Sequence, residues 1–238
     1  CNQMVNFLGI MQNEGAGAQA FSSFDTYLAP FVKVDHLSYP EVKKCIEAFI
    51  YGVNTPSRWG TQAPFSNITL DWTVPDDLAE LPALVGGVEM DFKYKDCKKE
   101  MDMVNKAFIE TMIEGDANGR GFQYPIPTYS ITKDFDWSDT ENNRLLFEMT
   151  AKYGTPYFSN YINSDMQPSD VRSMCCRLRL DLRELRKKTG GFFGSGESTG
   201  SVGVVTINMP RIAYLSANKD EFYARLNHMM DIAARSLK

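Results

Sequence analysis

Apolar residues recur at helical spacing in several stretches of the chain, and two of these stretches begin with a capping box. In Ser38-Tyr39-Pro40-Glu41, serine precedes glutamate by three residues and proline lies just inside the helix start. Apolar residues then recur at i, i+3, i+4, i+7 and i+8 from Val42 to Ile50. Ser138-Asp139-Thr140-Glu141 is the second box, and Gly154 ends its helix. A further helix is predicted from about Asp96 to Ile113, with Gly115 as its end, and another from about Lys219 to Leu237. Residues 6–11 resemble the interior of a helix.

Short β-like runs lie between these helices. Val202–Ile207 is almost continuously apolar and β-branched, which is typical of a strand covered on both faces in a parallel sheet. Arg177–Leu182 instead alternates polar and apolar residues, which suits a strand with one face in water. Because strands and helices are interleaved, the sequence predicts an α/β fold. The predicted strands are Ser66–Leu70, Ile126–Thr132, Tyr157–Ile162, Arg177–Leu182 and Val202–Asn208.

Composition and charge narrow the class of protein. The chain has 238 residues, is 43% hydrophobic and 23% charged, and carries a formal net charge of -5. This composition gives enough apolar surface for a core and excludes disorder as the main state. No repeat, low-complexity tract or long linker divides the chain, so we expect one continuous structural unit. The acidic excess argues against binding DNA through its phosphates, although a free nucleotide needs only one local site.

The N-terminal residues and the length of the apolar runs indicate where in the cell the protein is expected. No apolar run approaches the roughly 18 residues that cross a bilayer, and the N-terminal residues show neither a basic region nor a cleavage-like site. We therefore expect a cytoplasmic protein without membrane contact. The chain opens with Cys1 rather than methionine while a helix pattern is already under way, so we expect a piece of a longer polypeptide.

The five cysteines argue against a zinc site or a disulfide framework. Their number is odd, no C-x-x-C spacing occurs, and the only histidines are His36 and His228. Cys45 and Cys97 fall on the apolar stripes of predicted helices. We expect both to be small buried hydrophobes.

The adjacent pair Cys175-Cys176 is the strongest candidate for chemistry. It lies where a polar, turn-prone segment, 163–169, leads toward a predicted strand, a place where a loop tip can hold a thiol over a pocket. Side chains of neighbouring residues in extended chain diverge, so an ordinary disulfide between the two is disfavoured. The alternative is that both are small residues packing the start of a strand.

Polar loops supply further candidate contacts. The five glycines of Thr189–Ser201 permit backbone N–H groups to approach a phosphate or ribose, but the stretch lacks the ending of a Walker A loop, and its bare pattern favours a connector. Arg58 lies in a polar loop that could line a nucleotide site. Asn208 ends a predicted parallel strand at the edge where α/β folds bind ligands, although an Asn shortly before proline also initiates turns, which is the simpler interpretation.

Four segments carry, in the same order, a resemblance to a known family. Within them, Ser-Met-Cys-Cys-Arg-Leu followed by Gly-Val-Val-Thr-Ile-Asn-Met-Pro-Arg-Ile is the most specific part. The sequence resembles the anaerobic (class III) ribonucleoside triphosphate reductases, and the likeness covers essentially the whole chain. The four segments are Asn13–Thr26, Tyr124–Tyr129, Asp170–Leu182 and Gly200–Arg211.

The resemblance implies a fold and a reaction. Residues 1–238 would form one segment of the catalytic core, part of a ten-stranded α/β barrel with a central cysteine finger loop of the glycyl radical enzyme type. The family motif places Cys176 at the fingertip, next to Cys175, and Met174 matches the formate-using branch. A thiyl radical on Cys176 would remove the ribose 3′ hydrogen, the 2′ hydroxyl would leave as water, and formate or a second thiol would supply electrons. Because a hydrogen-atom carrier must be a neutral, shielded thiol, we expect Cys176 to be buried.

The remaining site predictions are weaker. Glu197 and Asn208 are candidates for polar groups of the catalytic pocket. Candidates for substrate or effector contacts are Gly194, Ser195, Gly196, Ser23 and Arg58.

The resemblance also implies cofactors and partners. It implies a glycyl radical on a residue outside this chain, an S-adenosylmethionine-dependent activating enzyme, deoxynucleotide and ATP effectors, and a homodimer. Several family features have no counterpart in these residues: the upstream reducing cysteine, the N-terminal ATP-binding region, the C-terminal zinc-binding cysteines and the Arg-Val-x-Gly-Tyr segment. We therefore expect this segment not to turn over by itself. Gly15 stands where the family has tryptophan, a change that would leave space in the core.

Two other functions stay open. A pyruvate formate-lyase-like radical acyl transferase also uses adjacent cysteines, although the pattern of Val202–Arg211 disfavours it. The third possibility is a non-catalytic nucleotide-binding or subunit-contact module derived from the reductase.

Overall fold

The computed structural model describes residues 1–14, 19–56, 63–162, 164 and 205–236, and only the backbone of 171–174 and 178–181. The chain divides into two compact units, Cys1–Gly196 and Glu197–Lys238. Gly15, the departure from the family pattern, lies outside the described residues. That all 238 residues form one catalytic-core segment stays a prediction.

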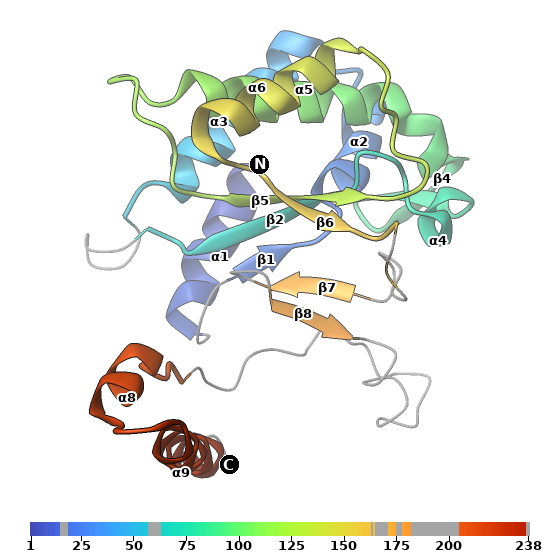
Figure 1. Ribbon diagram of the computed structural model, residues 1–238. Helices are drawn as coiled ribbons and strands as arrows, with labels where there is room; N and C mark the ends of the chain where they lie inside the picture. The colour runs from blue at the N-terminus through green and yellow to red at the C-terminus, as the bar shows by residue number, and fades with distance from the viewer. Residues whose placement is uncertain are drawn as a thin grey trace. The chain divides into compact units, whose positions relative to one another are not determined.

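A four-stranded parallel sheet organises the larger unit. Its strands are β1 (Gln19–Phe21), β2 (Ser66–Leu70), β5 (Ile126–Ile131) and β6 (Tyr157–Asn160), side by side in that order (Figure 1). All three neighbouring pairs are parallel. Parallel neighbours need long crossover connections, and here each crossover contains at least one helix. The predicted α/β class is confirmed as a mixed α/β fold with a parallel sheet.

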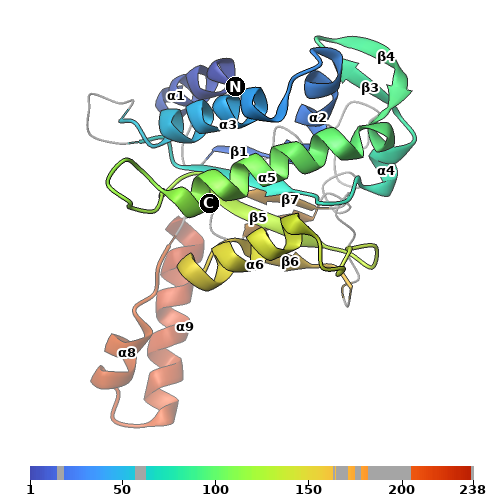
Figure 2. The ribbon, with the colours of Figure 1, turned by 90° about the horizontal axis from the view of Figure 1, so that it is seen from above.

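Helices cover one face of this sheet. Figures 1 and 2 show α3 (Tyr39–Val53), α5 (Lys98–Glu114) and α6 (Glu141–Tyr153) over it, while α2 (Phe24–Val34) packs on α5 and α1 (Asn2–Glu14) on α3. The core lies between this layer and the sheet, and each large apolar side chain buried there stabilises the fold by roughly 1.5–3 kcal/mol. Its central side chains are Ile46, Phe49, Ile50, Ile68, Leu70, Val104, Phe108, Tyr129, Leu146 and Met149.

Helix ends follow the sequence signals in part. The capping box of α3 is present, with the Ser38 N–H donating to Glu41 Oε2 at 2.8 Å, and Gly154 ends α6 at φ 66°. The predicted box at Ser138 is wrong, because Thr140 is the N-cap of α6 and its Oγ1 accepts the Asn143 N–H at 3.2 Å. Asp139 binds Arg144 instead, so the chain over 138–140 is a turn before the helix.

Short elements between β2 and α5 have no counterpart in the predicted set. They are helix α4 (Asp76–Ala79), the antiparallel hairpin of β3 (Pro82–Val85) and β4 (Val88–Lys93), and a 3-10 turn, η1 (Tyr94–Cys97). The hairpin turns at Gly86-Gly87, whose φ angles of 62° and 83° favour glycine. A second antiparallel pair, β7 (Val171–Met174) and β8 (Leu178–Asp181), agrees with the strand predicted near Arg177–Leu182.

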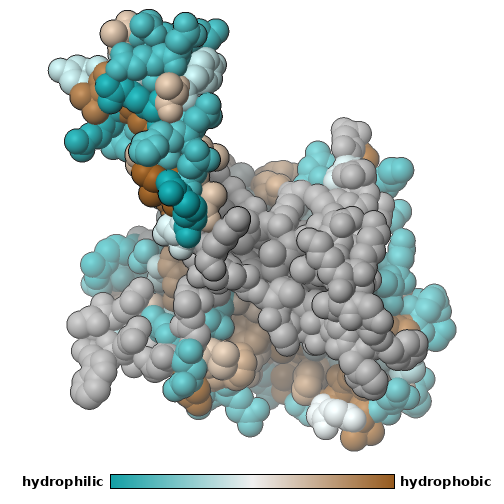
Figure 3. Space-filling model, turned by 90° about the horizontal axis from the view of Figure 1, so that it is seen from below, coloured by the Kyte–Doolittle hydropathy of each residue, from teal (hydrophilic) through white to brown (hydrophobic). Residues whose placement is uncertain are grey.

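The described residues of the smaller unit, 205–236, form two helices after an irregular start. These are α8 (Met209–Leu215) and α9 (Lys219–Ser236), and the surface of the unit is mostly hydrophilic with hydrophobic patches between (Figure 3). The strand predicted over Val202–Asn208 is wrong for 205–208, which have no regular structure, and 202–204 lie outside the described residues. Residues 205–208 pair with no strand of the described chain, and a strand needs a ladder partner for its N–H and C=O groups.

The two helical cysteines differ in burial. Cys97 is buried as predicted, whereas Cys45 is exposed and the prediction for it is wrong. At about 100° per residue, Cys45 lies roughly 80° from the centre of the stripe that α3 buries, so it belongs to the margin of that stripe. No helix among the described residues is long and apolar enough to cross a membrane.

Candidate functional site

The sheet face that points away from the core helices is lined by small polar side chains. Ile68 and Leu70 enter the core, so Asn67 and Thr69 point to the opposite face. Register places side chains of β5 and β6 on the same face, with Thr128 opposite Thr69. A parallel sheet covered on both faces normally carries Val, Ile and Leu on each. The polar members of this face are Asn67, Thr69, Thr128, Ser130, Tyr157 and Ser159, and none carries a charge; Ala20 and Ile126, in register with Asn67, belong to the same face.

A fully buried carboxylate joins the loops at the carboxyl ends of β1 and β2. Asp25, in the first turn of α2, is 0% exposed and accepts four N–H groups. Its Oδ1 accepts the N–H groups of Thr26 at 3.0 Å and Asp71 at 2.8 Å, and its Oδ2 accepts the Trp72 N–H at 3.0 Å and Asn105 Nδ2 at 2.9 Å. Burial raises the pKa of Asp25, and these four donors oppose the rise because they stabilise the anion.

Asp71 is the second buried carboxyl of this cluster. Thr26 Oγ1 donates to its Oδ2 at 2.7 Å, and the Ser23 side chain also hydrogen-bonds to it. Burial, followed by the negative charge of Asp25, raises the pKa of Asp71 to about 8. Because Asp25 accepts four N–H groups, we expect the charge of the pair on Asp25 and its proton on Asp71.

Two residues beside this pair have left-handed backbone. Ser23 lies at φ 53° and Trp72 at φ 65°, a region that side-chain-bearing residues rarely adopt. Hydrogen bonds hold both, since the Ser23 N–H donates to Thr69 Oγ1 at 2.9 Å and the Trp72 N–H to Asp25. Strained backbone is common at ligand sites, so the carboxyl edge of β1 and β2 is a candidate for such a site.

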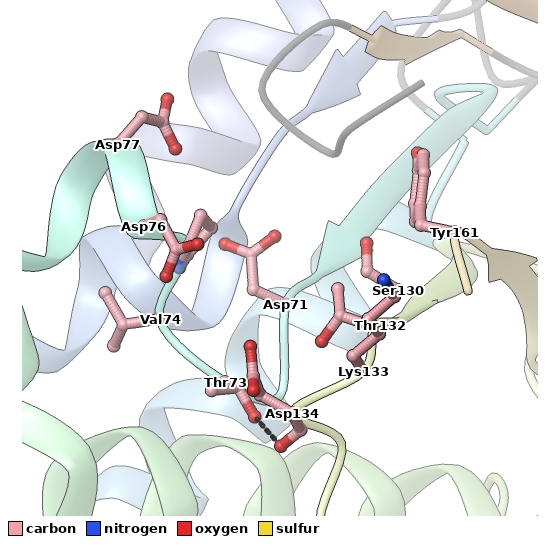
Figure 4. Close-up of a pocket in the computed structure, with 11 residues that line it drawn as sticks. Asp71, Thr73, Val74, Asp76, Asp77, Ser130, Thr132, Lys133, Asp134 and Tyr161 are labelled. Carbon is pink, nitrogen blue, oxygen red and sulfur yellow. Dashed lines mark hydrogen bonds between the residues drawn. The ribbon is translucent and has the colours of Figure 1, made fainter. Parts of the chain in front are cut away.

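A pocket of about 420 Å³ opens at this edge of the sheet. Figure 4 shows Asp71 in its wall, with Ser130 and Thr132 of the β5 end to one side and Asp76 of α4 to the other. Ser130 also belongs to the polar face, so the two features adjoin. Ligands of open α/β sheets bind outside the carboxyl ends of the strands, which is where this pocket lies. The other lining residues are Thr73, Val74, Pro75, Asp77, Lys133, Asp134 and Tyr161.

The described lining of this pocket carries charges of both signs. Asp76, Asp77 and Asp134 bring carboxylates to its wall, and Lys133 is the cation among its lining residues. Over the described chain, no three His, Cys, Asp or Glu side chains converge as metal ligands do. The pocket and the polar face together present hydroxyl, amide and carboxyl groups, which suit a hydrogen-bonding ligand.

A second hollow, of about 770 Å³, is lined from α2, α3 and α5. Lys33, Lys99 and Lys106 face it together with Glu100, and Lys106 Nζ lies 5.1 Å from the centre of the Tyr39 ring. This basic and aromatic lining suits an anionic ligand with a flat ring.

The structure places only three of the predicted site residues. Ser23 caps the start of α2 and contacts Asp71 through its side chain. Asn208 Oδ1 accepts the Arg211 N–H at 3.0 Å and caps α8, as expected of an Asn before Met-Pro, and Met174 ends β7. Their roles in a site stay predictions. The other predicted site residues, outside the described chain, are Arg58, Cys175, Cys176, Gly194, Ser195, Gly196 and Glu197.

The sequence interpretation missed the most strongly built polar groups. Asp25, Asp71 and Asn67 were not among its candidates, although Asp71 directly follows the predicted strand Ser66–Leu70 and is therefore at a strand's carboxyl end. That position was a usable signal. Asp25 gave a weaker one, because the three-residue strand β1 before it was not predicted.

Comparisons with known proteins agree with this geometry. The structure defines an α/β protein with a parallel sheet and a polar pocket at the carboxyl edge of that sheet. All of residues 1–238 match the sequence profile of the family described as anaerobic ribonucleoside-triphosphate reductase. The chain therefore belongs to the anaerobic ribonucleoside-triphosphate reductase family. No curated protein sequence matches it.

Solved structures of similar fold bear related descriptions. The anaerobic ribonucleotide reductase of Thermotoga maritima with citrate in the active site is 20% identical, with a TM-score of 0.64 over 97% of this chain and 40% of that one. A second structure, described as an anaerobic ribonucleotide reductase, is 21% identical with a TM-score of 0.62, over 97% of this chain and 36% of that one. The Thermotoga maritima enzyme in complex with dATP and CTP is 20% identical, with a TM-score of 0.60 over 97% of this chain and 38% of that one. The likeness shows a shared fold, and this chain spans about 40% of the first structure.

Proposed function

We propose that this chain is a segment of an anaerobic ribonucleotide reductase that binds ribonucleoside triphosphates and takes part in their conversion to 2′-deoxyribonucleoside triphosphates. The observation that carries the proposal is the family match over residues 1–238. The uncharged polar face and the adjoining pocket support it, because a sugar is a ligand that such groups bind. In this proposal the four-stranded sheet is part of a ten-stranded barrel with a central cysteine finger.

In the proposed reaction, Cys176 carries the radical that acts on the substrate. A glycyl radical outside these residues, generated by an S-adenosylmethionine-dependent activating enzyme, supplies the oxidising equivalent. The Cys176 thiyl then removes the ribose 3′ hydrogen, and the 2′ hydroxyl leaves as water. Formate is oxidised to CO2 and reduces the sugar radical by two electrons, after which Cys176 returns the hydrogen atom to C3′ and regains its radical. The polar face would hold the sugar in one orientation, since the contribution of the fold to radical chemistry is position. Met174 and Cys175 flank the thiol, and Glu197 and Asn208 remain candidates for polar groups near the sugar.

Nucleotide effectors are the second ligand class of the proposal. The basic hollow with Lys33, Lys99, Lys106 and Tyr39 suits the triphosphate and base of a deoxynucleotide or of ATP. The Thermotoga maritima reductase of similar fold is described with dATP bound in the specificity site, at 17% identity and a TM-score of 0.57. The further partners in this proposal are a second copy of the chain and the remaining segments of the reductase.

Binding and turnover test the proposal separately. We expect the chain to bind CTP but not pyruvate in calorimetry. Combined anaerobically with the remaining reductase segments, activating enzyme and formate, it should form dCTP, and Cys176→Ser should abolish the product. Binding of pyruvate instead of CTP would favour the acyl transferase. Binding of CTP with unchanged biological effect in Cys176→Ser would favour the non-catalytic nucleotide-binding module. Absence of CTP binding would refute the proposal.

A further inference from the structure

Asn67, on the polar face near the amino end of β2, has a buried acceptor without a partner. The residue is 1% exposed, and its side-chain oxygen Oδ1 makes no hydrogen bond. Buried polar atoms are nearly always paired, so an orphan in a central strand needs an explanation. Asn67 lies in register with Ala20 of β1 and Ile126 of β5, neither of which has a side-chain donor.

The neighbourhood of Asn67 defines the chemistry of a missing partner. A carboxamide oxygen accepts an O–H or N–H, and an ionised phosphate has no proton to give it. Thr69 follows Asn67 on the same face of β2, and Thr128, Ser130, Tyr157 and Ser159 continue this face over β5 and β6 with uncharged hydroxyl groups. Groups of this kind complement a ligand that carries several hydroxyls, which is the sugar part of a nucleotide.

The other buried orphans of the described chain lie elsewhere. They are Ser66 Oγ, which points to the core face of β2, Glu100 Oε2 in the first turn of α5, and Asn143 Oδ1 in the first turn of α6. The Asn143 amide is already engaged, since its Nδ2 donates to the carbonyl oxygens of Asp136 at 2.8 Å and Ser138 at 2.6 Å. Asn143 therefore has a local structural role, whereas Asn67 Oδ1 faces the proposed ligand side.

We propose that Asn67 is a specificity-determining residue of the substrate site, and that its side-chain oxygen accepts a hydrogen bond from a ribose hydroxyl. The assignment rests on the proposed function of ribonucleotide binding. It deepens that function by naming the group that distinguishes a ribonucleotide from its deoxy analogues. A site whose acceptor is left unpaired by the wrong ligand rejects that ligand.

Calorimetry with the full chain tests the assignment. The probes are CTP, 2′-deoxy-CTP and 3′-deoxy-CTP, and the variants are Asn67→Leu, which is close in volume but apolar, and Asn67→Ala, which cannot clash. We expect the unaltered chain to bind CTP about tenfold more tightly than at least one analogue, which corresponds to one hydrogen bond. Both variants should reduce that preference to less than about twofold.

Thermal unfolding separates this role from a structural one. Removing an unsatisfied buried acceptor should leave Tm of Asn67→Leu unchanged or raise it by about 2–4 °C, while binding discrimination is lost. Asn143→Leu is the matched control: it breaks two hydrogen bonds, so Tm should fall while the preference for CTP persists. Asn67→Leu should therefore change binding discrimination and not lower Tm, whereas Asn143→Leu should lower Tm and not change binding discrimination.

Each outcome bears on one proposal or on both. Retention of the CTP preference in Asn67→Leu and Asn67→Ala overturns the role of Asn67 and leaves ribonucleotide binding intact. Equal affinity of the unaltered chain for CTP and both analogues does the same. Absence of any CTP binding overturns the role of Asn67 together with the proposed function.

Discussion

Asp71→Asn removes a buried titrating carboxyl while preserving its size and its contacts with Ser23 and Thr26. In the folded chain, burial and the neighbouring Asp25 charge raise the pKa of Asp71 to about 8, whereas an aspartate in an unfolded chain titrates near roughly 3.9. The folded chain therefore holds a proton that the unfolded chain has released between these two pH values. The stabilising contribution is complete below about pH 4 and is lost as the pH rises toward 8.

The size of the effect follows from one proton. A folded state that binds one extra proton loses about 1.4 kcal/mol of unfolding free energy per pH unit, or about 3 kcal/mol from pH 5 to pH 7. That loss is a large part of the roughly 5–15 kcal/mol typical of a folded domain. Burial also raises the pKa of Asp25, which acts with the same sign as Asp71. Carboxyls with lowered pKa act with the opposite sign and in more acidic solution. They are Glu41, Glu80, Glu110, Asp116, Asp136, Asp139 and Glu221.

Urea unfolding at pH 5, 6 and 7 measures this slope. We expect the midpoint of the unaltered chain to fall with rising pH and that of Asp71→Asn to change much less. Asp139→Asn is the control, because Asp139 is an exposed carboxyl paired with Arg144 and its pKa is lowered, so its slope in this window should match the unaltered chain. Equal slopes for the unaltered chain and Asp71→Asn would refute the assignment of the proton to Asp71.

Three further predictions concern the stability of the fold. Asp25→Asn turns an acceptor of four N–H groups into an amide with donors of its own, so unfolding free energy should fall by about 3–5 kcal/mol in urea titrations; a loss below about 1 kcal/mol would contradict this. Gly52→Ala puts a Cβ 2.8 Å from both Cγ atoms of Val5, so the free energy of unfolding should fall by about 1–3 kcal/mol. In the double variant, Val5→Ala should restore part of this loss, and additive losses would argue against the contact. Because Thr140 is the N-cap of α6, Thr140→Ala should lower the free energy of unfolding by about 1 kcal/mol and Ser138→Ala by less than about 0.5 kcal/mol. The reverse order would indicate that Ser138 is the cap.

The helices of the core were predictable because their signals are local. The capping box at Ser38, the periodic stripe that follows it and the terminating Gly154 all act within a few residues. The misplaced start of α6 shows the limit of such signals. Serine and threonine are both common N-cap residue types, so the sequence alone does not choose between Ser138 and Thr140. The contacts of the preceding turn with Asp136 and Asn143 decide which of them is the N-cap.

The strands were predictable only where their pattern matched their surroundings. Ser66–Leu70 was predicted with the bounds of β2, but its division into a core face and a polar face follows from pairing with β1 and β5, which no local pattern contains. The apolar run ending at Asn208 shows the converse. Its composition favours a strand, yet residues 205–208 remain irregular because strand formation depends on a partner at long range.

The ligand side of the sheet gathers features that a protein selected only for stability would lack. Asp25 and Asp71 place two carboxyls in one buried cluster, Trp72 beside them has strained backbone, and Asn67 leaves an acceptor unpaired. Each feature costs stability, and each lies on the polar face or at the carboxyl edge of β2. Natural proteins retain such costs where function requires them. We therefore expect stabilising substitutions without loss of binding to come from the helical face, and those at Asn67 or Asp71 to raise stability only at the expense of ligand recognition.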